Sequence, residues 1–311
     1  MPLPRRLKAD LALGFVSFIW GATFVVVKSA LADASPLVFV FLRFALAAGL
    51  LLALFRGRTT LRAPGLVWAG SVIGFFLCAG YVFQTVGLQY TTPAKSAFIT
   101  ALSIVWVPLI LLVVFRRRLR VWLLAGVAAA GLGMFFLTVP PGAFTIARGD
   151  LITFFCALAF AGHIIAVGHY APRYGAAGLA VWQVGAALAM VTLVVPLAGA
   201  TGLETPHLAW TGRLVLALVV SAVLATALAF CVQTWAQQFT SPTHTAILYT
   251  LEPVFAALTS YVVLGEALGR RGLLGAGLIL AGVLLAELRG ASAPGVPGVA
   301  RSANPSGKGA V

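Results

Sequence analysis

Long apolar stretches separated by short polar linkers run through almost the whole chain. A helix needs about 20 predominantly apolar residues to cross a bilayer, and the chain offers ten stretches of suitable length. They are residues 9–29, 36–55, 65–88, 94–115, 119–138, 150–171, 176–198, 210–235, 243–264 and 271–289. This pattern predicts an all-α polytopic membrane protein with ten transmembrane helices.

The second half of the chain repeats the first. Residues 84–137 align with residues 233–286 at a constant offset of 149 and without a gap. Identical pairs include Gln84/Gln233, Thr85/Thr234, Thr91/Thr240, Pro93/Pro242, Ala97/Ala246, Gly126/Gly275 and Gly133/Gly282. A match of this length and spacing indicates a duplicated domain. With five predicted spans per copy, an odd number, the second copy is inverted in the membrane relative to the first.

The predicted organisation is therefore two inverted five-helix repeats around a central cavity. The repeats cover residues 9–138 and 150–289, after a short N-terminal segment of residues 1–8. Residues 290–311 are rich in Gly, Pro, Ala and Ser, a composition that predicts a disordered tail.

Composition and charge support a membrane protein and its orientation. The chain is 61% hydrophobic and 9% charged, whereas soluble domains are about 25% charged. A net charge of +14 would suggest a nucleic-acid partner in a soluble protein. Here 14 of the 21 Lys and Arg lie at the two ends and in alternate linkers. The positive-inside rule then predicts an inner (plasma) membrane protein with both termini in the cytoplasm, and no nucleic-acid partner.

Several segments resemble the drug/metabolite transporter superfamily, in particular the EamA-type permeases. They are TTPAKSAFITALSIVWVPLI (91–110), SPTHTAILYTLEPVFAALTSYVVLGEAL (241–268), FIWGATFVVVKSAL (18–31) and LRFALAA (42–48). The resemblance covers roughly residues 9–289. It implies ten helices around a substrate cavity, alternating access, and export or uptake of a small metabolite. Members of the superfamily handle amino acids, sugars, nucleotide derivatives and drugs, so the resemblance names no substrate.

Two ionisable residues fall at membrane depth, where a charged side chain is costly and therefore points to function. Arg43 can meet a carboxylate or phosphate of the substrate, or it can bind helix-terminal carbonyl groups. Glu252 is the one carboxylate in the middle of a predicted span. It precedes Pro253, which loosens a helix one turn back. Glu252 can couple transport to a proton or recognise a substrate amine, or it can be a hydrogen-bonded structural residue at a kink.

Lys95 and His244 are equivalent in the repeat and begin the fourth span of each copy, each followed by a hydroxyl residue. Because the copies are inverted, the two side chains lie on opposite sides of the membrane, and we predict them as matched gates. The alternatives are a Lys95 that reaches the interface by snorkelling and a His244 that is hydrogen-bonded at a helix end.

Gln84 and Gln233 are a second equivalent pair, which can join helices or face the substrate. The other candidates for a polar and aromatic cavity lining are Trp20, Tyr81, Ser96, His163, Gln183 and Tyr249. Aromatic residues in membrane helices also serve in packing and at the interface, so a structural role remains open for each.

Enzymatic function is disfavoured because the seven acidic residues are scattered, with no two within one helical turn. Metal-dependent membrane enzymes need clustered acids or His/Glu pairs, and the chain has no Walker loop for ATP. We therefore expect no metal and no cofactor.

The prediction is a secondary transporter working by alternating access, as a monomer or weak homodimer. It exports amino acids or related metabolites or drugs, with proton coupling as a hypothesis. The alternatives are uptake of a sugar or nucleotide derivative, a passive channel and a membrane-embedded enzyme.

Overall fold

The structure is a computed structural model that describes residues 4–57, 59–116, 120–139, 147–264 and 269–290. The predicted tail lies outside these residues except for Gly290. The described part of the chain folds into helices and turns, with one isolated β-bridge between Ala34 and Leu208. The first helix begins at Arg5, so it includes half of the segment predicted to precede it.

The helices of the first repeat are α1 (Arg5–Ala30), α2 (Pro36–Phe55), α3 (Leu66–Gln89), α4 (Pro93–Ala101), α5 (Ser103–Val113) and α6 (Val121–Thr138). Those of the second are α7 (Arg148–Tyr174), α8 (Ala176–Ala200), α9 (Gly212–Val219), α10 (Ala229–Ala236), α11 (Pro242–Tyr249), α12 (Leu251–Leu264) and α13 (Arg270–Gly290). A 3₁₀ turn, η1 (Thr59–Arg62), follows α2, and a π-helix, η2 (Val220–Leu228), joins α9 to α10. Each predicted span overlaps one helix or a run of consecutive helices.

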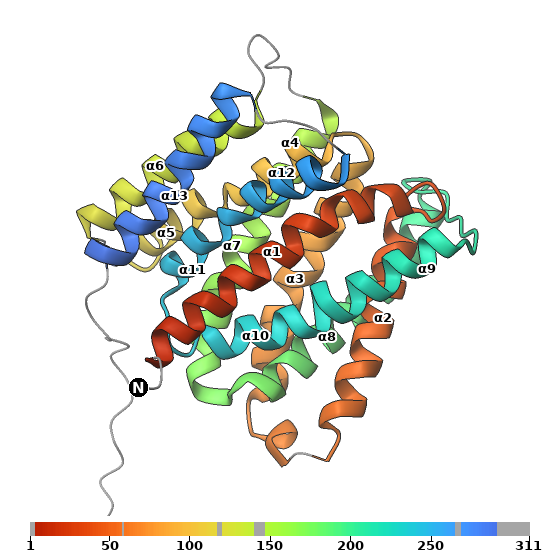
Figure 1. The fold of residues 1–311 in the computed structure, drawn as a ribbon. Helices are drawn as coiled ribbons and strands as arrows, with labels where there is room; N and C mark the ends of the chain where they lie inside the picture. The colour runs from red at the N-terminus through yellow and green to blue at the C-terminus, as the bar shows by residue number, and fades with distance from the viewer. Residues whose placement is uncertain (1–3, 58, 117–119, 140–146, 265–268, 291–311) are drawn as a thin grey trace, which may run out of the picture.

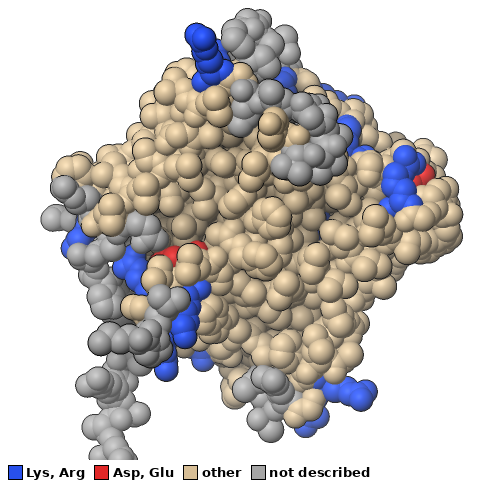
Figure 2. Space-filling model, viewed as in Figure 1, with Lys and Arg blue, Asp and Glu red and all other residues tan. Residues whose placement is uncertain are grey.

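Seven helical segments are long and apolar enough to cross a membrane. They are α1, α2, α3, Lys95–Val113, α7, α8 and Gly212–Ala236, and α6 adds a shorter apolar helix. Large apolar side chains such as Trp68, Leu193 and Val113 lie exposed on the surface of the described part. Figure 2 shows that the visible face is almost wholly uncharged, with Lys and Arg at its edges. Such a surface is suited to contact with lipid.

The fourth span of each repeat is broken into two helices, at positions that differ by one residue in the repeat. The first break falls at Leu102, between α4 and α5, and the second at Thr250, between α11 and α12. Both α4 and α11 start with a proline, whose missing N–H costs nothing at the first helical position. Each start is capped by a side-chain oxygen. The Thr92 hydroxyl accepts a hydrogen bond from the Lys95 N–H, and the Ser241 hydroxyl accepts one from the His244 N–H. The duplicated sequence thus produces the same local structure twice.

Helices α6 and α13 lie side by side at one edge of the molecule (Figure 1). Their contact is made through glycines: a Cβ at Gly126 would lie 2.8 Å from the carbonyl oxygen of Gly282. A Cβ at Gly133 would lie 2.6 Å from that of Gly275. Gly275 and Gly282 are the repeat equivalents of Gly126 and Gly133, so each glycine meets the equivalent of the other. This reciprocal contact is what an inverted two-fold relation between the repeats requires.

Candidate functional site

A central cavity of about 60 Å³ lies between the two repeats, with room for a few water molecules. Its lining comes from the first, second, third and fourth spans of the first repeat and from the first, third and fourth spans of the second. The lining residues are Trp20, Thr23, Phe24, Val27, Arg43, Tyr81, Gln84, Leu88, Thr100, Ala101, Ser103, Phe160, His163, Ile164, Phe230, Gln233, Tyr249 and Glu252. Neither α6 nor α13 contributes to it.

The lining follows the internal repeat. At the offset of 149, the matched lining residues are Tyr81/Phe230, Gln84/Gln233, Thr100/Tyr249 and Ser103/Glu252. The first two helices of each repeat align at a different offset, 140, and there the matched pairs are Trp20/Phe160, Thr23/His163 and Phe24/Ile164. The cavity is therefore built twice from equivalent positions, but with different chemistry. Its carboxyl group, Glu252, stands where the first repeat has Ser103.

Arg43 is held by the π-helix of the opposite repeat. Its Nε donates to Thr226 Oγ1 at 2.6 Å, and one Nη donates to the carbonyl oxygen of Ala225 at 3.0 Å and to the Tyr81 hydroxyl at 2.9 Å. Trp20 Nε1 donates to the same Ala225 oxygen at 2.9 Å. A π-helix shifts the backbone register and offers carbonyl groups to side chains. Arg43 thus lines the cavity and also binds the carbonyl group of Ala225 in the π-helix.

Glu252 is the second residue of α12, just after the helix break, and is 6% exposed. Among the described residues, no hydrogen bond or ion pair joins its carboxyl group to another side chain. Two further buried lining atoms, Tyr249 Oη and Gln233 Oε1, have no hydrogen-bond partner. Buried polar atoms are nearly always satisfied in folded proteins. The hydrogen bonds of these groups are left for water or a polar ligand to make.

The other buried polar candidates are linked to one another. His163 Nε2 lies 2.9 Å from Gln183 Oε1, and Gln183 Nε2 donates to Thr234 Oγ1 at 3.0 Å. Gln84 Nε2 donates to Thr100 Oγ1 at 3.3 Å. Gln183 is fully buried but does not line the cavity. Gln183 thus contacts the lining residue His163 from outside the cavity.

The remaining candidates lie away from the cavity. Ser96 is buried and its hydroxyl has no hydrogen-bond partner, but it is not part of the lining. Lys95 lies at the start of α4 and pairs with Asp150 of α7. His244 lies at the start of α11, 3.4 Å from Asp10 of α1. Lys95 and His244 thus each connect the start of a broken fourth helix to the other repeat.

Sequence reasoning missed several members of the site. Phe160, Phe230, Thr100 and Ser103 line the cavity, and the offsets of 140 and 149 pair each of them with a residue that was predicted to line it. The carbonyl group of Ala225 was not predictable in this way, because it becomes available only through the π-helix.

Within the described residues, no group of three or more His, Cys, Asp and Glu could hold a metal ion.

The helices, the apolar surface and the cavity between inverted repeats define the chain as a polytopic membrane protein. Its residues 7–139 and 147–288 each match the model of the EamA-like transporter family. The chain belongs to the EamA-like transporter family, within the drug/metabolite transporter superfamily, which confirms the resemblance noted in the sequence. It is a membrane transporter of small molecules rather than an enzyme.

A relative from Archaeoglobus fulgidus, described as an uncharacterized transporter, is 37% identical over 288 residues, covering 92% of this chain and 87% of the archaeal protein. A solved crystal structure, titled only as that of a protein, matches with a TM-score of 0.72 at 22% identity, over 90% of this chain and 96% of the other. This second likeness shows the fold alone.

Proposed function

We propose that the protein is a secondary active exporter of amino acids or closely related metabolites, with ten transmembrane helices and both termini in the cytoplasm. The observation that carries this proposal is the placement of two unlike charges, Arg43 and Glu252, in one small cavity between inverted repeats. No ion pair joins them among the described residues. A zwitterionic substrate satisfies both charges, its ammonium group at Glu252 and its carboxylate at Arg43.

Alternating access is supported by the inverted repeat. When two equivalent halves surround a site, exchanging their conformations turns an inward-facing state into an outward-facing one. The breaks at Leu102 and Thr250 provide places where each half can bend, because a helix break absorbs backbone rotation. Helices α6 and α13, packed closely on each other and outside the lining, form a scaffold that need not move.

Export follows from exchange at Glu252. A carboxylate that binds either a proton or an ammonium group, but not both, exchanges one for the other across the membrane. Protons flow into the cytoplasm down their gradient, so the substrate moves out. The coupling requires that proton and substrate each change the inward–outward equilibrium through different affinities for the two states.

The proposal is tested by counterflow in proteoliposomes with radiolabelled amino acids and sugars, with and without a proton gradient. We expect an amino acid to be transported, and its decarboxylated and N-acetylated analogues to compete at least about tenfold more weakly, because each leaves a buried charge unpaired. Arg43→Gln should reduce the preference for the carboxylate, and Glu252→Gln the preference for the amine. Glu204→Gln is the control, since Glu204 caps α2 at Leu37 N outside the cavity. Transport of a sugar with no effect of either charge substitution would contradict the proposal.

A further inference from the structure

Each broken fourth helix is tied at its first turn to the first helix of the other repeat. Lys95 Nζ in α4 lies 3.3 Å from Asp150 Oδ2 in α7. His244 Nε2 in α11 lies 3.4 Å from Asp10 Oδ1 in α1. Both contacts cross between the repeats, and because the repeats are inverted they lie at opposite ends of the molecule.

The two contacts are equivalent in sequence as well as in place. Lys95 and His244 match at the offset of 149. Asp10 and Asp150 match at the offset of 140, inside the short segments KADL (8–11) and RGDL (148–151). We call them the Asp150 clasp, formed by Thr91, Lys95 and Asp150, and the Asp10 clasp, formed by Thr240, His244 and Asp10.

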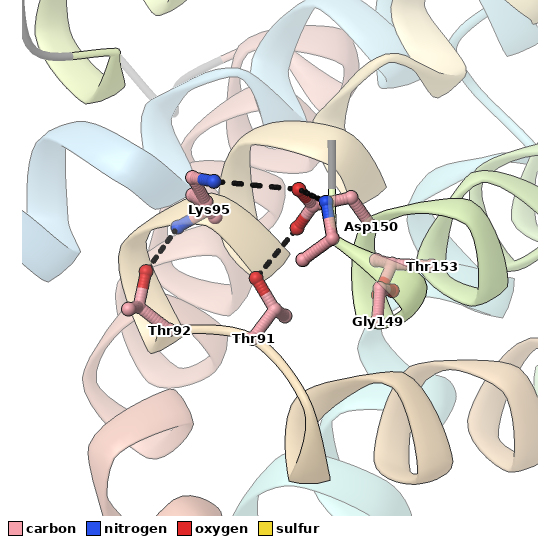
Figure 3. A network of polar contacts seen from close by, with 7 residues as sticks. Thr91, Thr92, Lys95, Gly149, Asp150 and Thr153 are labelled. Carbon is pink, nitrogen blue, oxygen red and sulfur yellow. Dashed lines mark hydrogen bonds and ion pairs between the residues drawn. The ribbon is translucent and has the colours of Figure 1, made fainter. Parts of the chain in front are cut away.

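The Asp150 clasp is fully formed. Figure 3 shows Lys95 and Thr91 directed at the Asp150 carboxylate. The Thr91 hydroxyl donates a hydrogen bond to Asp150 Oδ1 at 2.6 Å. The backbone N–H of Ala147 donates to the other carboxylate oxygen at 2.9 Å. The carboxylate thus has three polar partners, of which Thr91 and Lys95 link the start of α7 to the start of α4.

The Asp10 clasp is formed by the equivalent residues, with His244 in place of Lys95, and two of its polar atoms make no hydrogen bond. Thr240, the equivalent of Thr91, has a buried hydroxyl with no hydrogen-bond partner. Asp10 Oδ1 also receives no hydrogen bond, so the 3.4 Å contact with His244 is an ion-pair distance without hydrogen-bond geometry. Bonds that are made at one end of the molecule are left unmade at the equivalent place at the other end.

The helix backbones also approach each other more closely beside the Asp150 clasp than beside the Asp10 clasp. Next to the Asp150 clasp, α3 and α7 meet through Gly87 and Gly149, and a Cβ on Gly149 would lie 2.6 Å from the Gly87 carbonyl oxygen. The equivalent residues at the other end are Ala236 and Ala9, whose methyl groups prevent so close an approach. A hollow of about 660 Å³ also opens at the ends of α2, α7 and α10, bordered by Gln238, two residues before Thr240.

The helix that each clasp holds ends at the cavity. From Lys95 in its first turn, α4 continues to the break at Leu102, which lies beside the lining residues Thr100 and Ser103. Helix α11 runs from His244 to the break at Thr250, beside Tyr249 and Glu252. A rotation of either half-helix about its break therefore changes the lining of the cavity directly.

We infer that α4 and α11 are hinged gates at the two ends of the substrate path, latched by the Asp150 and Asp10 clasps. The structure is the state in which the Asp150 gate is closed and the Asp10 gate is partly released. This assignment deepens the proposed function and rests on its topology, which puts the Asp150 clasp on the outer side and the Asp10 clasp on the inner side.

The test measures access to the cavity from each side and requires no substrate. Ser103→Cys is introduced into the full chain after replacement of Cys78, Cys156 and Cys231, and a membrane-impermeant maleimide is added to right-side-out or inside-out vesicles. Loss of a hydrogen bond to a charged group shifts a two-state equilibrium about tenfold. We therefore expect Asp150→Asn to raise the labelling rate from the outer side about tenfold, and Asp10→Asn to raise it only from the inner side.

Thr91→Ala and Thr240→Ala form the matched pair of controls, since they remove the same hydroxyl from equivalent places. Thr91→Ala should raise outer labelling, whereas Thr240→Ala, which removes no bond in this state, should not. The charge exchange Lys95→Asp with Asp150→Lys should lower the rate below that of Asp150→Asn, but not to the original value, because a lysine at position 150 cannot accept the Thr91 hydrogen bond. Unchanged labelling in both Asp variants, or increased labelling from the same side in both, would overturn the gate assignment. Because labelling needs no substrate, a failed gate assignment remains distinct from a failure of amino-acid transport.

Discussion

The contact between α6 and α13 allows a quantitative test of the inverted two-fold packing. In Gly133→Ala the new methyl carbon would lie 2.6 Å from the Gly275 carbonyl oxygen and 2.7 Å from Ile279 N. Both neighbours are backbone atoms, so the two helices must move apart. Overpacking of this kind costs about 1–3 kcal/mol, offset by up to about 1 kcal/mol from the higher helix propensity of alanine.

Gly131→Ala, two residues away on the same helix, is the matched control. A Cβ there meets nothing within 4 Å, so it gains the same helix propensity without the clash. The difference between the two variants isolates the packing cost of about 1–3 kcal/mol. Since 1 kcal/mol corresponds to about 2–4 °C for a chain of 150–250 residues, Gly133→Ala should unfold several degrees below Gly131→Ala.

The assay is thermal unfolding in detergent at one fixed scan rate, because membrane proteins often unfold irreversibly. By the two-fold relation, Gly282→Ala, whose Cβ would lie 2.7 Å from the Gly126 carbonyl oxygen and 2.8 Å from Ala130 N, should cost as much as Gly133→Ala. Equal unfolding midpoints for Gly133→Ala and Gly131→Ala would refute the close contact and with it this evidence for inverted repeats.

Three further predictions concern other parts of the molecule. Arg213 and its hydrogen bonds lower the pKa of Asp33 in the α1–α2 turn. The stabilisation from this pair is therefore present above the ordinary carboxyl range near pH ~4 and is lost as pH falls further. Asp33→Asn should lower the unfolding midpoint at pH 7 but not in strong acid, and an effect independent of pH would exclude the ion pair as its cause. Arg43→Lys should lower stability by about 1.5–3 kcal/mol, because an ammonium group cannot reproduce the fork that binds the Ala225 carbonyl; an unchanged midpoint would show that the π-helix does not depend on it. A reporter that works only in the cytoplasm should be active when it is fused after Gly290, and one that works only outside should be inactive there. Activity of the second reporter would mean an odd number of spans.

The sequence could predict most of the architecture because the repeat and the apolar spans are direct consequences of bilayer thickness and duplication. The break at Thr250 has a signal in the sequence, since Pro253 removes a backbone donor near it. The break at Leu102 has no such signal, because the residue equivalent to Pro253 is Ile104. The family assignment rests on these same segments.

Three features of the site could not be predicted from the spans. The π-helix over residues 220–228 has no glycine or proline to mark it, so no local signal in the sequence predicts that the Ala225 carbonyl group is available to bind Arg43. The contact of Lys95 with Asp150 joins two repeats across 55 residues of sequence and depends on how the repeats pack. The offset of 140 for the first two helices is hidden by weak identity, and the matched cavity lining makes it visible.

The measurement that tests the central claim most directly is substrate accumulation driven by a proton gradient in proteoliposomes, comparing the wild type with Glu252→Gln. With an acidic interior, proton efflux should drive the wild type to accumulate its amino acid against a gradient. Glu252→Gln, which cannot release a proton, should lose this accumulation while still exchanging labelled for unlabelled substrate at reduced affinity. If Glu252→Gln accumulated substrate as strongly and with the same dependence on the pH gradient, Glu252 would be a structural residue at a helix break, and the coupling account would be wrong.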